Sequence, residues 1–227
     1  MSNNIITIEG LEKTYTDSLQ SLTILHDVDM TIEQGKKVII IGESGSGKST
    51  LLNIIAGLDG ATKGTVQVGD ITVSNLVEKE LAQYRSKFLG LIFQFHYLLK
   101  DFTALENVYL PLYMTGENKK TAIEKAKILL CDVGLEHRMN HLPSQLSGGE
   151  KQRAAVARAL IHNPELILAD EPTGNLDPEN AVIISDMLFT LVEKYKKTLL
   201  LVTHEMSLCD RGDIKYRIKK GRVENDI

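Results

Sequence analysis

The sequence predicts an α/β fold built around a mostly parallel β-sheet. Three short runs, at residues 38–41, 166–169 and 198–202, are continuously apolar. Each run leads into a loop, and helical patterns lie between the runs, as is typical of strands buried on both faces of a parallel sheet. The predicted helices span residues 48–58, about 119–131, 150–162 and 179–195.

The amino-terminal segments follow a different pattern. Residues 5–10 (IITIEG) and 27–32 (DVDMTI) alternate between apolar and polar side chains, which predicts antiparallel strands with one face exposed. The region from about 94 to 163 is mostly helical in pattern. We therefore expect a single domain over residues 1–227, with a core formed by 1–93 and 164–227 and a helical subdomain at about 94–163.

Composition limits the classes of function. The formal charge is −4. This value gives no support to nucleic-acid binding, because nucleic-acid-binding proteins usually have a basic excess or a basic stripe. Cys131 and Cys209 have no metal-ligand spacing and are expected to be reduced thiols. The first residues do not resemble a secretory signal, and no apolar run approaches the roughly 20 residues that span a bilayer. The chain is thus expected to be soluble by itself, so that any membrane-spanning part belongs to another polypeptide.

A phosphate-binding loop follows the first apolar run. The pattern G-x-x-x-x-G-K-[ST] is matched by Gly42, Gly47, Lys48 and Ser49. Its glycines allow backbone N–H groups to converge on phosphate oxygens, and the following helix adds its positive end. Lys48 would pair with the β- and γ-phosphates, and the Ser49 hydroxyl would bind Mg²⁺. The remaining predicted contacts are Ser44, Gly45, Ser46 and Thr50. The alternative is a glycine turn that only reverses the chain.

The second apolar strand ends in two carboxylates. In LILADEPTGNLD (166–177), Asp170 and Glu171 come directly after the buried residues. The carboxyl ends of strands in α/β sheets face the ligand crevice. Asp170 suits an outer role at Mg²⁺, and Glu171 can orient or deprotonate a water molecule. An ordinary exposed turn would have the same composition.

A third motif, LSGGEKQR (146–153), predicts a capped helix start. Ser147 and Glu150 have the spacing of a capping box, and Gly148 and Gly149 leave the expected helix N-terminus without side chains. A bare helix N-terminus also binds anions. The simplest reading is a helix cap and nothing more.

LSGGE, the phosphate loop and LILADE together resemble the ATP-binding cassette of ABC transporters over nearly the whole chain. The resemblance implies a P-loop NTPase core with a mostly parallel sheet, an antiparallel β subdomain and a helical subdomain that carries the signature. It also implies ATP and Mg²⁺ as cofactors, and a homodimer in which Ser147, Gly148 and Gly149 contact the γ-phosphate held by the other copy. Further roles by resemblance are adenine stacking for Tyr15, contact with Mg²⁺ and the membrane partner for Gln94, the D-loop for Asp177 and a γ-phosphate contact for His204. Taken singly, Tyr15 could be a strand-surface aromatic residue, Gln94 an exposed amide and His204 a hydrogen-bonded strand-end histidine.

Segments 93–112, 133–150 and 168–177 resemble more narrowly the cassettes of lipoprotein-releasing (Lol) exporters. They are also similar to macrolide- and peptide-exporter cassettes and to a cell-division cassette that regulates a membrane protein without moving cargo. Small departures are Glu205, where Asp is usual, and the Ala154-Ala155 pair. The resemblance implies an ATPase peripheral to the cytoplasmic face of the inner membrane. The segment FQFHYLL (93–99) is rich in aromatic and aliphatic residues, and we expect integral membrane subunits to dock near Phe93, Tyr97 and Leu98. The alternative is that this segment packs in the core of the helical subdomain.

Other classes are disfavoured. Translation factors and DNA-repair ATPases carry tandem cassettes or long coiled coils, whereas this chain has one of each motif and no heptad run. A GTPase or small-molecule kinase has no use for LSGGE, and the sequence has no guanine-reading N-K-x-D.

Overall fold

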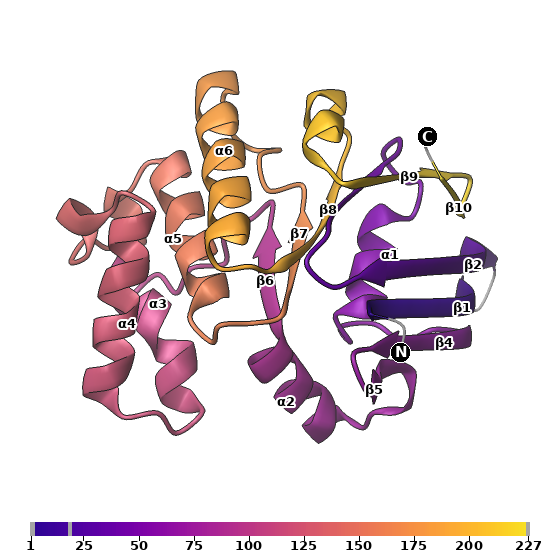
Figure 1. Cartoon of the computed structure of the whole chain (residues 1–227), viewed down its shortest axis with the longest axis horizontal. Helices are drawn as coiled ribbons and strands as arrows, with labels where there is room; N and C mark the ends of the chain where they lie inside the picture. The colour runs from indigo at the N-terminus through magenta and orange to yellow at the C-terminus, as the bar shows by residue number, and fades with distance from the viewer. Residues whose placement is uncertain (1–2, 18–19, 226–227) are drawn as a thin grey trace. The chain divides into compact units, whose positions relative to one another are not determined.

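The computed structural model describes residues 3–17 and 20–225 (Figure 1). The chain forms two compact units, Met1–Arg85 with Lys197–Ile227, and Ser86–Lys196. The strands of the first unit are β1 (Asn4–Thr16), β2 (Ser21–Glu33), β3 (Lys37–Ile41), β4 (Lys63–Val68), β5 (Ile71–Thr72), β8 (Thr198–Thr203), β9 (Ile214–Lys219) and β10 (Arg222–Asn225). Its helical segments include α1 (Lys48–Ile55) and the first part of α2 (Glu78–Phe88), with 3₁₀ turns at Val73–Asn75 and Met206–Arg211.

The antiparallel sheet predicted at the amino terminus is present. β1 pairs with both β2 and β4, and the sheet has the order β2-β1-β4-β5. Alternate side chains of β2 are buried, because successive residues of a strand point to opposite faces. The N-terminal alternation therefore identified the correct kind of sheet.

The second strand group of this unit carries the phosphate loop. β3 pairs in parallel with β8 and with β9, and β10 pairs antiparallel with β9. The apolar residues of β3 are fully buried, as its continuous apolar run predicted. Helix α1 contacts β2, β4 and β8. It ends at Ile55, earlier than the predicted residue 58, because Gly57 adopts a left-handed φ of 63° and closes the helix.

The second unit contains β6 (Leu89–Phe93), α3 (Ala104–Met114), α4 (Lys119–Asp132), α5 (Gly148–Leu160), β7 (Leu166–Asp170) and α6 (Pro178–Lys194). Short 3₁₀ turns lie at Glu136–Arg138 and Pro143–Gln145, and α2 (Glu78–Phe88) precedes β6. Helices α3, α4 and α5 contact one another, and α5 also contacts β6 and α6. The predicted helical region is thus present.

Strands β6 and β7 bring two predicted loops to one edge. They pair in parallel with Phe93 opposite Asp170. Gln94 and Glu171, the next residue on each strand, therefore leave the strand pair at the same carboxyl edge. Gly90 in β6 permits a close approach of α5, because a Cβ atom there would lie 2.5 Å from the Ala159 carbonyl oxygen.

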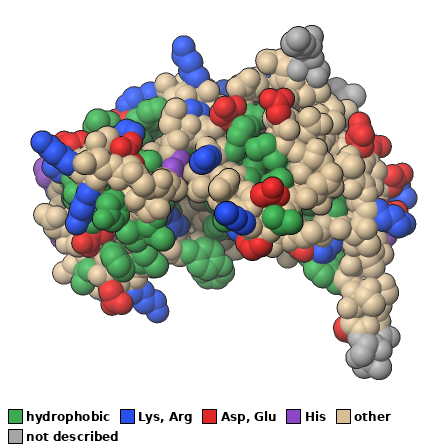
Figure 2. Space-filling model, turned by 90° about the horizontal axis from the view of Figure 1, so that it is seen from below, with side chains coloured by type: hydrophobic (Ala, Val, Ile, Leu, Met, Phe, Trp, Pro, Cys, Tyr) green, Lys and Arg blue, Asp and Glu red, His purple; other side chains and the backbone are tan. Residues whose placement is uncertain are grey.

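Acidic and basic side chains are interspersed on the face shown in Figure 2, and neither sign forms a continuous patch there. This agrees with the small net charge of −4. Among the helices of the described residues, none is long and apolar enough to cross a lipid bilayer.

Candidate nucleotide-binding site

The phosphate loop of the first unit connects β3 to α1, and its glycines are required by space and by backbone geometry. A Cβ atom on Gly42 would lie 2.6 Å from the Ile218 carbonyl oxygen and 2.7 Å from Ser46 Oγ. Gly47 precedes α1 with φ 108°, a conformation that side chains disfavour. The loop is therefore tight, and both positions require glycine.

Two polar side chains of the loop fit an anion. Lys48 Nζ donates hydrogen bonds to the Gly42 and Glu43 carbonyl oxygens at 2.8 and 3.0 Å, so its ammonium group lies across the loop. Ser46 Oγ is buried and has no hydrogen-bond partner within residues 3–17 and 20–225. A buried hydroxyl without a partner is costly, and a phosphate oxygen would supply one.

A cavity of about 580 Å³ adjoins this loop in the first unit. Gly42, Glu43 and Ser46 line one part of it, and His204 lines another. Residues of β9, β10 and the turn between them, among them Arg217, Lys219 and Lys220, line a further part of its wall. The structure thus brings the predicted His204 to the same cavity as the phosphate loop.

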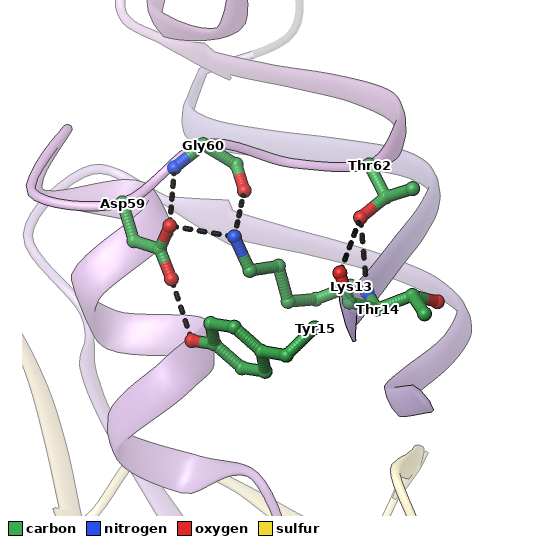
Figure 3. A network of polar contacts seen from close by, with 6 residues as sticks. All are labelled: Lys13, Thr14, Tyr15, Asp59, Gly60 and Thr62. Carbon is green, nitrogen blue, oxygen red and sulfur yellow. Dashed lines mark hydrogen bonds and ion pairs between the residues drawn. The ribbon is translucent and has the colours of Figure 1, made fainter. Parts of the chain in front are cut away.

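Tyr15 lies at the end of β1 with 46% of its surface exposed. Its hydroxyl donates a hydrogen bond of 2.6 Å to Asp59 Oδ2 (Figure 3). That hydrogen bond is the main cause of a raised Tyr15 pKa, burial adds to it, and a hydrogen bond with the Thr50 side chain opposes it. Tyr15 is therefore next to α1, the helix that begins at the phosphate loop.

The acidic strand end of the second unit contains a strained residue. Glu171 follows β7 and has φ 46°, which is unusual for a residue with a side chain. Its carbonyl oxygen accepts a hydrogen bond of 3.0 Å from Gly174 N. Such a backbone conformation persists only where the surrounding structure enforces it, and it is found most often at active sites and ligand-binding segments.

Gln94 is tied to the same loop. Its Nε2 donates to Asn175 Oδ1 at 3.0 Å, and Asn175 Nδ2 donates to the Gln94 carbonyl oxygen at 3.2 Å. A Cβ atom on Gly174 would lie 2.9 Å from Gln94 Nε2, so glycine makes room for this pair. Gln94 is thus a paired amide, and sequence reasoning missed its partner Asn175.

The signature motif forms the predicted capping box at the start of α5. Ser147 Oγ accepts from Glu150 N at 3.2 Å, and Glu150 accepts from Ser147 N at 2.8 Å. Glu150 also accepts from Arg138 Nε at 3.0 Å. The backbone hydrogen bond from Ser147 is the main cause of the lowered Glu150 pKa.

The two glycines of the motif differ in exposure. Gly148 is exposed, but Gly149 is buried, and a Cβ atom there would lie 2.6 Å from Asn180 Oδ1. Asp177 caps α6 by accepting from Asn180 N and Nδ2 at 3.0 and 2.7 Å. Asn180 therefore links the Asp177 turn to the signature, and Asp177 has a structural role of its own.

Two further residues of α5 hold the neighbouring loops and were not found from the sequence. Gln152 is buried and donates to the Pro172 and Phe93 carbonyl oxygens at 2.7 and 3.2 Å. Arg158 donates to the Tyr97 and His96 carbonyl oxygens at 2.6 and 2.7 Å, and burial lowers its pKa. Glutamine and arginine are common on helix surfaces, so no sequence pattern indicated these contacts.

Comparison with known proteins identifies the family. The family model described as "ABC transporter" matches residues 25–174, which is more than half of the chain. The chain belongs to the ABC transporter family. The sequence-based expectation of an ATP-binding cassette is confirmed, and with it the α/β fold and the class of ATPase.

Relatives of this cassette match it over nearly its whole length. The lipoprotein-releasing system ATP-binding protein LolD of Treponema denticola is 57% identical over 224 residues, which cover 99% of both chains. LolD of Treponema pallidum is 50% identical, covering 98% of this chain and 99% of its own. Among solved structures, the dimeric post-hydrolysis state of the cassette MJ0796 bound to ADP and Pi matches with a TM-score of 0.89, 39% identity and 97% coverage of each chain.

Proposed function

We propose that this cassette is the ATP-hydrolysing subunit of an exporter that releases lipoproteins from the inner membrane. The observation that carries the proposal is the full-length similarity to LolD proteins, at 57% identity with that of Treponema denticola. The cassette would work as a homodimer on the cytoplasmic face of the membrane, as a peripheral partner of integral membrane subunits. The dimeric MJ0796 structures support the assembly.

The residues of the phosphate loop fit a nucleoside triphosphate with its Mg²⁺. We propose that the loop N–H groups of residues 42–50 and Lys48 bind the phosphates, with the buried Ser46 hydroxyl as a further donor, and that the exposed ring of Tyr15 stacks on the adenine. The described residues contain no group of three or more His, Cys, Asp or Glu side chains that could hold a metal ion. Mg²⁺ accompanying a triphosphate keeps water and phosphate ligands, so it needs few protein groups. Ser49, Gln94 and Asp170 are the proposed ones.

Hydrolysis needs a positioned water molecule and neutralised phosphate charge. We propose that Glu171 orients the water and accepts its proton, while His204 and Lys48 neutralise charge on the γ-phosphate. Ser147, Gly148 and Gly149 of one copy would contact the nucleotide bound by the phosphate loop of the other. Since Gly149 is buried against Asn180, the exposed part of the signature is Ser147 and Gly148.

The test is ATP-driven dimerisation of a hydrolysis-deficient variant. Glu171→Gln keeps the side-chain shape and removes the base, so turnover should fall by about 10²–10⁴-fold. With saturating ATP and Mg²⁺, light scattering after size-exclusion chromatography should detect a stable dimer. Lys48→Ala should bind no nucleotide and remain monomeric. A Glu171→Gln variant that stays monomeric, even with its membrane subunits, would contradict the proposed mechanism.

The proposed docking surface is the segment after β6. Tyr97 is 66% exposed and Phe95 60%, and the Phe93 and Tyr97 rings meet edge-on with centroids 5.6 Å apart. Exposed aromatic anchors dominate many interfaces. Replacing Tyr97 and Leu98 with glutamate should abolish co-purification with the membrane subunits while ATP affinity is kept.

The control for the docking test is Tyr113→Glu, which alters another exposed tyrosine of the same unit, 46% exposed. Survival of co-purification in the Tyr97 and Leu98 variant would reject the surface. Reconstituting the co-purified complex with a lipid-anchored protein tests the cargo. ATP-dependent release supports lipoprotein export, whereas ATPase activity without release favours the regulatory alternative.

A further inference from the structure

We propose that Asp59 is a positioning residue of the nucleotide site, which fixes the ring of Tyr15 through its hydroxyl and so strengthens binding of the adenine base. The inference deepens the proposed function and rests on it. Asp59 itself need not touch the nucleotide.

The Asp59 carboxylate is held at both oxygens (Figure 3). Oδ1 accepts hydrogen bonds from Lys13 Nζ at 2.6 Å and from Gly60 N at 2.7 Å. Lys13 Nζ is fixed in turn by the Gly60 carbonyl oxygen at 2.7 Å. Oδ2 is left to accept from the Tyr15 hydroxyl at 2.6 Å. The carboxylate therefore has one orientation, and that orientation determines where the Tyr15 hydroxyl lies.

The strand that carries Tyr15 is anchored beside this network. Thr14 N donates to Thr62 Oγ1 at 2.9 Å, and Thr62 Oγ1 donates to the Thr14 carbonyl oxygen at 3.3 Å. The pairing of β1 with β2 shifts register on both sides of Lys13. Irregularities of this kind redirect side chains, and here they accompany Lys13 and Tyr15 both facing Asp59.

Lys13 covers one face of the Tyr15 ring, and much of the rest of the residue is exposed. Lys13 Nζ lies 4.6 Å from the ring centroid, in the geometry of a cation–π contact. Lys13 is 8% exposed, whereas Tyr15 is 46% exposed. A base can therefore stack only on the ring surface turned away from Lys13. A ring already fixed in this position loses less freedom when the base binds than a ring that rotates.

A purely structural role for Asp59 predicts different behaviour. If the ion pair with Lys13 only joined β1 to the segment that follows α1, its loss would weaken the binding of all ligands of the phosphate loop equally. If Asp59 acts through Tyr15, its loss would weaken ATP and leave inorganic tripolyphosphate unaffected, because tripolyphosphate has no base. The Tyr15 hydroxyl would also be required for any effect of Asp59.

The experiment measures the affinity of the purified full chain for ATP and for tripolyphosphate by calorimetry, in the Glu171→Gln background. Asp59→Leu and Tyr15→Phe should each weaken ATP binding by roughly three- to tenfold, the range expected for one hydrogen bond. Neither should change tripolyphosphate binding. Combining both substitutions should weaken ATP no further than either alone. Glu12→Gln is the matched control. Glu12 lies on β1, like Tyr15, and its carboxylate forms an ion pair with Lys63 of β4 at 2.8 Å. The substitution therefore removes a carboxylate from an ion pair on the same strand as Tyr15 but leaves the Tyr15–Asp59 hydrogen bond in place.

Each other outcome overturns the proposal. Unchanged ATP affinity in Tyr15→Phe, whose small change does not threaten folding, excludes a role for the hydroxyl. Equal weakening of ATP and tripolyphosphate by Asp59→Leu indicates a general structural role, and additive effects in the double variant exclude action through Tyr15. Failure of the proposed function would give a different result. The unmodified chain would bind neither ATP nor tripolyphosphate if the loop held no triphosphate, and Tyr15→Ala would bind ATP normally if Tyr15 did not stack on the adenine.

Discussion

Ser147 and Thr103 cap two helices of the same unit with the same geometry, which allows capping and nucleotide contact to be separated. In each capping box the hydroxyl oxygen accepts from the glutamate N–H at 3.2 Å, and the glutamate carboxylate accepts from the cap N–H at 2.8 Å. Replacing such a cap with alanine costs about 1 kcal/mol, within a range of 0.5–2. For a chain of 227 residues, that cost lowers the melting temperature by about 2–4 °C. Ser147→Ala and Thr103→Ala should therefore be similarly destabilised.

The two variants should differ in nucleotide-driven dimerisation. A hydrogen bond to a charged group contributes about 1.5–3 kcal/mol. The proposed homodimer would have two signature contacts, so Ser147→Ala should lose roughly 3 kcal/mol or more of dimer stability, a weakening of at least about a hundredfold. The assay is analytical ultracentrifugation with ATP and Mg²⁺ in the Glu171→Gln background, beside thermal unfolding of each variant. Equal dimerisation of Ser147→Ala and Thr103→Ala would refute the contact between Ser147 and the phosphate. Helix capping would then be the remaining role of Ser147.

Three further predictions concern the second unit. Gly90→Ala should destabilise the fold by about 1–3 kcal/mol in urea unfolding, because its Cβ would lie 2.5 Å from a backbone oxygen of α5, whereas Gly60→Ala has open space and should cost less. Arg158→Lys should speed amide hydrogen exchange at residues 96–98, since an ammonium group cannot replace the planar fork that donates to two carbonyl groups; unchanged exchange would contradict this. Glu150→Gln should melt below the unmodified chain at pH 7, and the gap should close as the pH falls below the ordinary glutamate value of 4.5, because a lowered pKa contributes stability only while the group is ionised. A difference in melting temperature that stays the same from pH 7 down to the acid limit of folding would argue against a contribution from the Glu150 charge.

The sequence identified the elements whose patterns are local. The continuous apolar runs found β3, β7 and β8, and the S-x-x-E spacing found the capping box of α5. Helix α3 was not predicted, and it continues through Pro111, against the usual preference of proline. β6 was also not predicted. Its five residues include Gly90, which interrupts the apolar run, and the sequence does not show that this glycine is needed for the close approach of α5.

The site was predictable where the chemistry follows from a motif. The phosphate loop, the acidic strand end and the signature are contiguous segments, so their spacing could be read directly. Contacts between distant residues could not be read in this way. Lys13 and Asp59 are ordinary charged residues on separate segments, and only the fold shows that they meet at Tyr15. The burial of Gly149 likewise depends on Asn180, a residue of another helix.

Helix α5 has one end in the signature and the other at the segment that follows β6. Ser147 caps its start, and Arg158, near its end, binds the backbone of His96 and Tyr97. At a rise of 1.5 Å per residue, these two positions are roughly 16 Å apart along a single rod. Because a helix is stiff, we expect a tilt at the N-terminus of α5 to displace the His96 and Tyr97 carbonyl groups that Arg158 binds. We therefore expect a movement of one end of α5 to displace the other end without any change in secondary structure.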